Sequence, residues 1–474
     1  MGSLAVANLP GLRPLPLLGS RAALIRLFAD PLRTLPRLHA EFGDIAAMCR
    51  GDASVVCVFG PAYNQQILPN AQLFEVSTDL PVPLPEGSAF ARLSEHLARV
   101  NGGEHRRLRR LLTPAFSKPA ISGYRDTMVE IISAHLDRWR PGEDLDLAAA
   151  MHELTLDVMS ACLFGVTADP QGENLVDLAA RFLRGMSSPA TMLLPVDLPF
   201  LPFGRHLRLA EALEARMLAL IESRRREGLE GRRDAFSLLL AANEQVEGEA
   251  PLSEAEIVAN AALLFLAGYE TTANGLISAL MLLAQHPQVQ VDLRAELDAR
   301  LHGAAPSLDD LADLPLLSAV VDEALRMLPA SFIIFLRRSS AAIELGPHQI
   351  PAGATFVLSP LVTHHMPEVW PEPRRFSPQR WLERKPTPFE FIPFGGGTRR
   401  CIGAAFSEQE MRLALAQIIQ RFALALHPGQ RIDYVARGIT MGVANPIRTR
   451  LLSPAETPRT AADIDGQIRN WVDW

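Results

Sequence analysis

The segment from residue 251 to residue 285 stands out along the chain and predicts a long buried helix. Ser253 followed by Glu256 forms the pattern of a capping box at its start, and His286-Pro287 predicts its end. About thirty helical residues would span roughly 50 Å, the width of a domain of this size. Because apolar residues lie nearly all round the middle of the segment, we expect this helix to cross the interior.

Elsewhere the pattern predicts a mainly α-helical protein with a small β portion. The first 70 residues are rich in proline and include a strand-like run at 54–60, whereas residues 100–430 are mostly helical in pattern. Proline and glycine gather in three segments that predict irregular structure: 192–205, 345–353 and 366–397. We therefore expect a single domain over residues 1–474, with a β-rich portion at about 30–75 and a helical remainder.

Composition and charge narrow the class of protein. The chain has 46 Lys and Arg residues against 53 Asp and Glu residues, and a formal charge of -7 excludes the basic surface that binds nucleic acid. Prolines near the N-terminus break the apolar run well short of the ~20 residues that cross a membrane. We therefore expect a cytoplasmic protein without a membrane anchor. Reduced thiols are expected rather than a disulfide framework, because the long chain has only Cys49, Cys57, Cys162 and Cys401.

Polar residues interrupt the apolar helix at its centre, at Glu270, Thr271, Thr272 and Asn274. A buried carboxylate is costly unless it is paired or neutralised. Threonine hydroxyls can bond back to helix carbonyls and loosen the turn, and Gly268 weakens the helix further. These residues predict a widened groove with a proton-handling acid and hydroxyl. A kinked core helix whose polar residues satisfy one another would show the same pattern.

A glycine-rich loop, FGGGTRRCIG, occupies residues 394–403. Its three glycines allow a close approach of backbone to a ligand. The loop amides, the helix expected after Gly403 and the two preceding arginines would each lower the pKa of the Cys401 thiol. The loop is therefore expected to hold a thiolate. The alternatives are a buried inert thiol and a phosphate-binding loop, although the strand and lysine of a phosphate loop are missing.

Two helical segments carry charges at helical spacing. Glu323 and Arg326 lie three residues apart and share a helix face, so they can pair; on a helix surface such a pair contributes little. His105 and Arg109 lie four residues apart, point the same way and could bind an anion together. An exposed basic helix face is the alternative for this second segment.

In this order, the motifs resemble those of the cytochrome P450 family. Residues 394–403 match the family's haem loop, Phe-x-x-Gly-x-Arg-x-Cys-x-Gly, at every specified position. The residues AGYETT at 267–272 match its oxygen-activation motif, Glu323 and Arg326 match its Glu-x-x-Arg helix, and 378–381 match its Pro-x-Arg-aromatic element. The resemblance extends from LPLLGS near the start to the C-terminal region. It implies the P450 fold, with haem b between the long central helix and the cysteine loop.

The resemblance also implies a role for each matching residue. Cys401 would be the thiolate ligand of the iron, Thr271 would hydrogen-bond dioxygen, Glu270 would supply protons, and Phe394 would pack beside the sulfur. A structural triad would consist of Glu323, Arg326 and Arg380. The implied haem contacts are His105, Arg109, Ala267, Thr271, Arg337, Pro393, Phe394, Gly395, Arg399, Cys401, Ile402 and Gly403.

The haem propionates would pair with four cationic side chains: His105, Arg109, Arg337 and Arg399. We prefer Arg337 to Arg338 because the Glu344-Leu345 strand then falls in register, although the segment before Arg337 is one residue longer than usual. Two other positions depart from the family's common residues. Tyr269 stands where relatives often have His, and Glu270 where many have Asp; the expected roles are unchanged.

The family's substrate pocket is walled by variable stretches, which here are the segment before His105, residues 186–205, Ala330–Phe335 and Ile439–Val443. These stretches are mostly apolar, and they predict a lipophilic substrate such as a terpenoid, polyketide or fatty-acid derivative. The pocket residues that we predict are Leu263, Ala267, Phe332, Ile333 and Met441.

The sequence therefore predicts a bacterial-type, monomeric haem-thiolate monooxygenase of secondary metabolism that hydroxylates or epoxidises its substrate with O2. No flavin or iron–sulfur domain fits in the chain, so electrons would come from NAD(P)H through a reductase and a separate ferredoxin or flavodoxin, docked near Arg399-Arg400. The alternatives are a peroxide-using or peroxide-rearranging haem-thiolate enzyme and a non-catalytic haem or ligand-binding protein. The intact Glu270-Thr271 pair argues against both.

Overall fold

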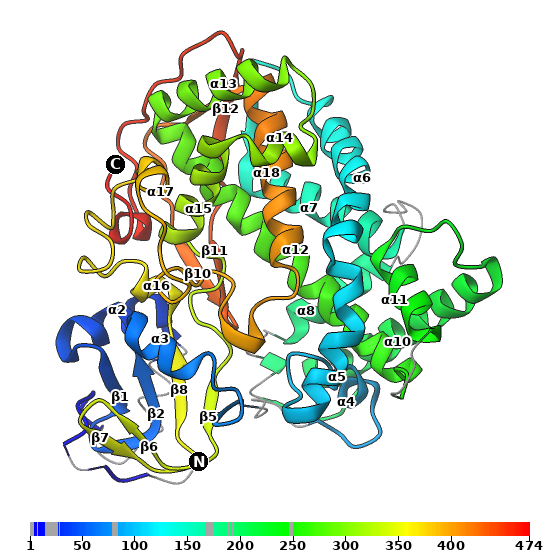
Figure 1. Ribbon diagram of the computed structural model, residues 1–474, viewed down its shortest axis with the longest axis vertical. Helices are drawn as coiled ribbons and strands as arrows, with labels where there is room; N and C mark the ends of the chain where they lie inside the picture. Colours follow the sequence, from blue (N-terminus) through cyan, green and yellow to red (C-terminus); the bar gives the residue numbers. More distant parts are fainter. Residues whose placement is uncertain are drawn as a thin grey trace.

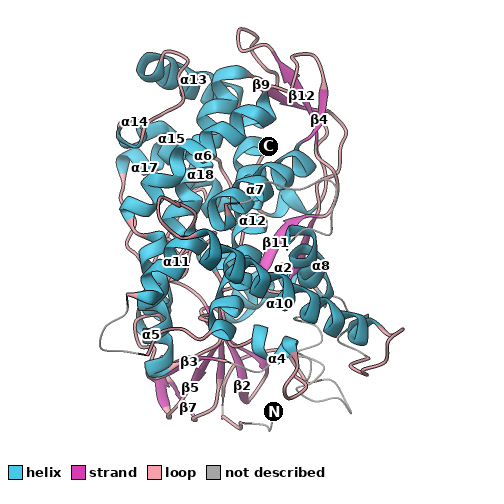
Figure 2. Cartoon of the chain, turned by 90° about the vertical axis from the view of Figure 1, so that its right-hand side faces the viewer, coloured by secondary structure: helices cyan, strands magenta, loops and turns pink. Residues whose placement is uncertain are grey.

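The computed structural model describes residues 4–6, 8–14, 27, 29–77, 84–165, 175–186, 190–191, 194–245 and 250–474. Helices make up most of this part of the chain, and the strands form four small sheets (Figure 1 and Figure 2). The predicted fold class, mainly α with a small β portion, is confirmed. The LPLLGS motif and parts of the 186–205 stretch lie outside the described residues.

The helices are α2 (Pro31–Phe42), α3 (Pro61–Ile67), α4 (Ala89–Leu93), α5 (Gly102–Leu112), α6 (Lys118–Leu136), α7 (Leu147–Phe164), α8 (Leu175–Met186), α10 (Pro202–Glu227), α11 (Ala235–Glu244), α12 (Glu254–Gln285), α13 (Pro287–Leu301), α14 (Leu308–Ala312), α15 (Pro315–Met327), α16 (Pro360–Thr363), α17 (Gln379–Glu383) and α18 (Ala404–Arg421). Short 3-10 turns occur at Thr113–Phe116, Gly397–Arg399 and Gln467–Asn470. The strands are β1 (Ile45–Cys49), β2 (Asp52–Val58), β3 (Phe74–Val76), β4 (Asp144–Asp146), β5 (Arg337–Ser339), β6 (Ile343–Leu345), β7 (His348–Ile350), β8 (Thr355–Leu358), β9 (Ala423–Leu426), β10 (Tyr434–Arg437), β11 (Thr440–Val443) and β12 (Arg448–Leu452).

The largest sheet joins segments that are far apart in the sequence. Its strand order is β1-β2-β8-β5-β3, with β2 and β8 parallel and the other neighbours antiparallel. It lies at the lower edge of Figure 1, where blue strands from the start of the chain meet yellow strands from residues 337–358. The portion expected to be β-rich, about 30–75, thus supplies only part of this sheet and also contains α2 and α3.

The central helix, α12, begins and ends where the sequence indicates. Ser253 Oγ accepts a hydrogen bond from the Glu256 backbone N–H, and the Glu256 carboxylate accepts one from the Ser253 N–H at 2.7 Å. This reciprocal capping box satisfies donors that the first helical turn leaves free. Since Ser253 is the cap, the helix starts at Glu254 rather than at residue 251. It ends at Gln285, and α13 begins at Pro287.

Helix α7 packs against α12 on the side of the polar interruption. A Cβ atom on Gly268 would lie 2.5 Å from the Met159 methyl carbon, so a side chain at this position would require the flexible end of Met159 to move. Thr155 of α7 also donates a hydrogen bond to the Tyr269 carbonyl at 3.1 Å. By length and composition α7 could cross a membrane, but 61% of its residues are buried inside the protein, so here it is a core helix.

Candidate active site

The glycine-rich loop runs between α17 and α18 and packs on the backbone after α3. Gly395 and Gly397 both have positive φ, +68° and +64°. A Cβ on Gly397 would lie 2.2 Å from the Leu68 carbonyl oxygen, so a side chain is excluded there. The Cys401 N–H donates to the Phe394 carbonyl at 2.9 Å and closes the loop. Gly403 then caps α18, as the sequence predicts.

Cys401 differs from the other cysteines of the chain. Cys49, Cys57 and Cys162 are buried, whereas Cys401 has exposed surface. Burial raises the pKa of Cys57 to about 12 and leaves that thiol protonated. A thiol that a ligand can reach is therefore found at Cys401.

The expectation that the loop lowers the pKa of Cys401 is wrong for the protein as it stands. Although the residue has exposed surface, protein atoms around the sulfur remove part of its water, and this desolvation raises the pKa of the thiol. The Gly403 amide and the charges of Arg400 and Arg109 act in the opposite direction, but they do not offset the loss of water. A metal ion bound to the sulfur would add a positive charge that favours the thiolate.

Four cationic or basic side chains from three segments converge beside the cysteine loop. Burial, and then the charges of Arg399, Arg109, Arg337 and Arg106, lower the pKa of His105 to about 4. Burial and the charge of Arg399 lower the pKa of Arg337 to about 10, and burial and the charge of Arg109 lower the pKa of Arg399 to about 10. Arg109 donates from Nη1 to the Arg400 carbonyl at 2.8 Å, which joins α5 to the loop. The four side chains are those predicted for the propionates: His105, Arg109, Arg337 and Arg399.

This cluster is short of hydrogen-bond acceptors among the described residues. Arg399 donates to the Val100 carbonyl and to Asn101, both at 2.6 Å, but its Nε has no partner. Arg337 is 4% exposed, and its Nη1 has no partner either. Buried guanidinium donors are normally paired. Carboxylates of a bound group would supply the missing acceptors and charge, so these residues fit the two propionates of a haem.

The β5 strand separates the two arginines between which the sequence analysis had to choose. Successive side chains of a strand point to opposite faces, and here Arg337 is buried while Arg338 is exposed. β5 pairs with β3 and β8 on its two sides, so this alternation is held by both neighbours. Only Arg337 faces the cluster beside the cysteine loop.

At the centre of α12, the two threonine hydroxyls bond to carbonyls of the preceding turn. Thr271 Oγ1 donates to the Ala267 carbonyl at 2.7 Å, and Thr272 Oγ1 donates to the Gly268 carbonyl at 2.9 Å. Thr272 also contacts the Ser407 hydroxyl of α18 at 3.0 Å. Ala267 is exposed and Thr271 partly exposed, although most of α12 is buried. These two residues therefore lie beside solvent-accessible space, although most of the helix around them is buried.

Glu270 lies next to this space and has a cation beside it. Its carboxylate is 3.5 Å from Nη1 of Arg437, the last residue of β10. The Glu270 side chain is 16% exposed, so its carboxylate reaches water.

Glu323, Arg326 and Arg380 form a connected ion network in which the first two side chains are fully buried. Arg326 Nε and Arg380 Nε lie 2.8 and 3.0 Å from the two Glu323 oxygens. Burial alone would raise the pKa of Glu323, but the charges and hydrogen bonds of the two arginines lower it below its usual value. The carboxylate also accepts from the Trp381 indole at 2.9 Å and the Ser377 N–H at 3.0 Å. It is thus an ionised core carboxylate with its acceptor positions filled.

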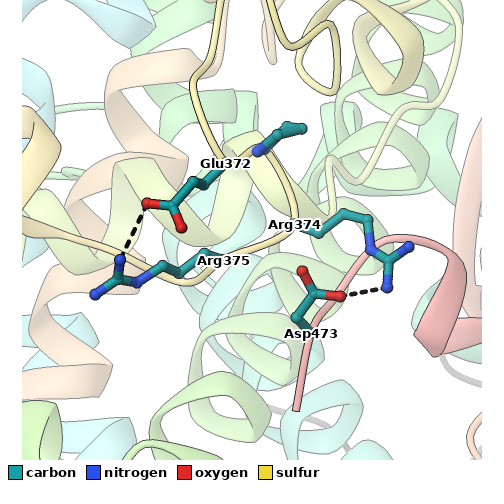
Figure 3. Close-up of a pocket in the computed structure, with 5 residues that line it drawn as sticks. Glu372, Arg374, Arg375 and Asp473 are labelled. Atoms are coloured by element: carbon teal, nitrogen blue, oxygen red, sulfur yellow. Dashed lines mark hydrogen bonds and ion pairs between the residues drawn. The ribbon is translucent and has the colours of Figure 1, made fainter.

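The arginines of this network also shape the segment that follows. Arg326 donates to the Pro373 carbonyl and Arg380 to the Pro371 carbonyl, at 2.8 and 3.0 Å. This segment borders a surface pocket of about 580 Å³ (Figure 3). In Figure 3 the charges of the pocket pair with one another, Glu372 with Arg375 and Arg374 with Asp473. The charged side chains of this surface pocket are therefore paired with one another, and the predicted catalytic residues do not line it.

The structure brings two of the predicted pocket walls together. The Met441 N–H donates to the Ala330 carbonyl at 2.9 Å, and Ser331 bridges to Thr440. Among the predicted pocket residues, Phe332, Ile333 and Met441 are buried and belong to the main core cluster, against which Leu263 packs. Ala267 lies one helical turn from Leu263 on the same face of α12.

Two site residues escaped the sequence analysis. Trp381 was matched to a motif but given no role, and its indole hydrogen bond to Glu323 appears only once α15 and α17 pack together. Arg437 carries no motif, and it meets Glu270 from 167 residues away. No local pattern could have indicated this contact.

Comparisons with known proteins agree with this geometry. The family model described as Cytochrome P450 matches residues 9–452. The chain is 32% identical to "Cyclooctat-9-en-7-ol 5-monooxygenase" of Streptomyces melanosporofaciens, over 87% of this chain and 89% of the relative. It is 30% identical to "Pentalenene oxygenase" of Streptomyces avermitilis, over 91% and 95%. The solved structure "Retinoic acid bound cyanobacterial CYP120A1" superposes with a TM-score of 0.81 at 26% identity, covering 95% of this chain and 100% of that one.

The fold and the thiol-bearing loop therefore define a haem-thiolate oxygenase, and the chain belongs to the cytochrome P450 family. It is a cytochrome P450 monooxygenase, as the sequence predicts. This class uses a haem-thiolate cofactor, dioxygen, a redox partner and a lipophilic substrate.

The choice between Arg337 and Arg338 can be tested by haem retention. We predict that Arg337→Gln loses a charge-assisted hydrogen bond to a propionate, on the order of 1.5–3 kcal/mol, and speeds the transfer of haem from the purified protein to apomyoglobin at least several-fold. Arg338→Gln is the matched control on the opposite face of β5 and should transfer haem at the wild-type rate. Equal acceleration in both variants would contradict the assignment.

Proposed function

We propose that this chain is a haem b monooxygenase that oxidises a cyclic terpenoid, with electrons from a separate ferredoxin or flavodoxin. The buried cluster of His105, Arg337 and Arg399, with unpartnered donors beside the one accessible cysteine, is the observation that carries this proposal. An anionic group against this cluster would supply the missing acceptors and offset the like charges.

Cys401 is the proposed iron ligand. When bound through this sulfur, the haem would supply the activation of O2. The chain contributes the position of the sulfur: Gly397 lets the loop lie on the Leu68 backbone, and the Cys401–Phe394 hydrogen bond holds the turn. The Phe394 ring lies 5.9 Å from the Arg400 guanidinium, which shields this side of the loop.

Glu270 and Thr271 are the proposed proton relay. Glu270 reaches water, while Thr271 borders the open space beside Ala267. Because the single Thr271 hydroxyl hydrogen is donated to the Ala267 carbonyl, its oxygen is left as a hydrogen-bond acceptor that can orient a proton donor in the groove. A carboxyl at the solvent side and a hydroxyl at the inner side form the two ends of such a path.

A terpenoid substrate is favoured by two observations. Two of the relatives are named as oxygenases of cyclooctat-9-en-7-ol and pentalenene. In this chain the predicted pocket residues are apolar: Leu263, Ala267, Phe332, Ile333 and Met441. A wall of this kind excludes water and binds hydrocarbon rings through the apolar surface that is buried. One or a few polar groups elsewhere would therefore set the orientation of the substrate.

The proposed docking face for the redox partner includes Arg400, which is exposed. Arg399 was expected there as well, but its guanidinium turns inward to Val100 and Asn101. Arg106 and Arg110 are exposed on α5, and α5 is bonded to the loop through Arg109. A basic face of this kind suits an acidic electron carrier. We further propose that the protein is a cytoplasmic monomer and a single domain.

The oxidant and the substrate class can be tested together. The holoenzyme would be incubated with a panel of cyclic terpene hydrocarbons and alcohols, ¹⁸O2, NADPH and a surrogate ferredoxin with its reductase. We expect a product that contains one ¹⁸O atom from at least one cyclic terpene. Product formed only with hydrogen peroxide, and none with NADPH, would instead favour the peroxide-using alternative.

The ligand assignment predicts that Cys401→Ala loses the thiolate-type absorption of the ferrous–CO complex, since no other accessible sulfur is present to replace it. Cys57→Ala, at a buried sheet position, should keep this absorption and serves as the control. A thiolate-type spectrum that survives in Cys401→Ala would refute the assignment.

The relay predicts that Thr271→Ala releases more hydrogen peroxide per NADPH consumed, because protons then arrive without the hydroxyl that orders their delivery. The ratio is measured with the surrogate ferredoxin system. Thr272→Ala removes a neighbouring hydroxyl that faces Ser407 instead, and it should leave the ratio unchanged. If both variants behave alike, Thr271 has no special part in the relay.

A further inference from the structure

The hairpin formed by β10 and β11 brings an arginine to the central helix. Arg437 Nη1 lies 3.5 Å from a Glu270 carboxylate oxygen, the contact already described between β10 and α12. The Arg437 side chain is 46% exposed and that of Glu270 is 16% exposed. The pair therefore lies at the boundary between solvent and the groove of α12.

Arg437 is held in place by a short, well-connected turn. It pairs with Thr440 in the β10–β11 register, and only Gly438 and Ile439 lie between them. Gly438 has φ +61°, a conformation that glycine adopts without strain, and it permits a two-residue turn. Thr440 Oγ1 also donates to the Arg437 carbonyl at 2.9 Å. The backbone of Arg437, from which its side chain extends, is thus fixed relative to β11.

The same hairpin is attached to the predicted pocket wall. The Met441 N–H donates to the Ala330 carbonyl, and Ser331 bridges to Thr440. A Cβ on Gly442 would lie 2.7 Å from Asn274 Oδ1, so β11 sits directly on α12 one turn beyond Thr271. The position of Arg437 is therefore set by a hairpin that lies against both the pocket wall and the central helix.

We propose that Arg437 is a positioning residue for the reaction, which holds the Glu270 carboxylate between solvent and groove. This proposal rests on the role of Glu270 in the proposed function. A single contact of 3.5 Å with a half-exposed guanidinium is weak, so the carboxylate can leave it and return within a catalytic cycle. A buried, bidentate pair would instead hold the carboxylate permanently. Arg437 thus restrains Glu270 while leaving it free to exchange protons.

The test uses the holoenzyme and a measurement that needs no substrate. NADPH and a surrogate ferredoxin system reduce dioxygen, and the fraction released as hydrogen peroxide rather than water is measured for wild type, Glu270→Gln, Arg437→Gln, Arg437→Lys and the Glu270→Gln/Arg437→Gln double variant. Arg431→Gln is the matched control, because Arg431 is an exposed arginine that pairs with Asp433 and not with Glu270.

We expect Arg437→Gln to raise the peroxide-to-water ratio about two- to fivefold, the range given by weak ion pairs of this exposure. Arg437→Lys should restore most of the wild-type ratio, and Arg431→Gln should not change it. In the Glu270→Gln background, Arg437→Gln should have no further effect, since its only route is through the carboxylate. Unchanged hydrogen exchange in residues 434–443 would show that the hairpin itself is intact in the Arg437 variants.

Three other outcomes would overturn the proposal. If Glu270→Gln raises the ratio and Arg437→Gln does not, Arg437 has no positioning role while the relay through Glu270 stands. If Glu270→Gln has no effect, the relay fails and the proposal for Arg437 fails with it. An equal effect of Arg437→Gln in both backgrounds would show that Arg437 acts by another route, and this result also contradicts the proposal.

Discussion

The fully buried pair of Glu323 and Arg326 is the constraint on which the rest of the structure depends. Both side chains are 0% exposed, and removing one partner of such a pair leaves an uncompensated charge in the core, at a cost of about 3–5 kcal/mol. The pair is tolerated only because every neighbouring group is arranged to satisfy it. Arg380 and Trp381 from α17 donate further hydrogen bonds to the Glu323 carboxylate. Helices α15 and α17 are therefore held together by the need to satisfy one charge.

This network extends by hydrogen bonds to the cysteine loop. Arg326 donates to the His364 carbonyl at 2.8 Å, and the His364 ring accepts from the Ile392 N–H at 2.9 Å. Pro393 and Phe394 follow directly, so the loop begins from a fixed point. Burial and the nearby Arg326 charge keep the pKa of His364 well below its usual value, which leaves its ring nitrogen neutral and able to accept. The ion network of Glu323 and Arg326 therefore also helps to position the Cys401 thiol.

Much of the fold and of the site could be predicted from local residues. The capping box at Ser253, the glycine loop before Cys401 and the i,i+3 spacing of Glu323 and Arg326 are short patterns, and the structure contains all three as written. Each depends on backbone geometry or on neighbours within one helical turn. The five-stranded sheet could not be predicted from one segment, because its strands come from residues 45–76 and 337–358.

The sequence by itself determined the class of the protein and indicated the candidate residues for its chemistry, since both follow from motifs of ten residues or fewer. The tertiary structure decided what each charge does. It buried Arg337 and exposed Arg338, turned Arg399 inward, and brought Arg437 to Glu270. It also raised the pKa of the Cys401 thiol, against the local expectation. The physical reason is the same in each case: burial and long-range electrostatics depend on which distant segments meet, and no local pattern contains that information.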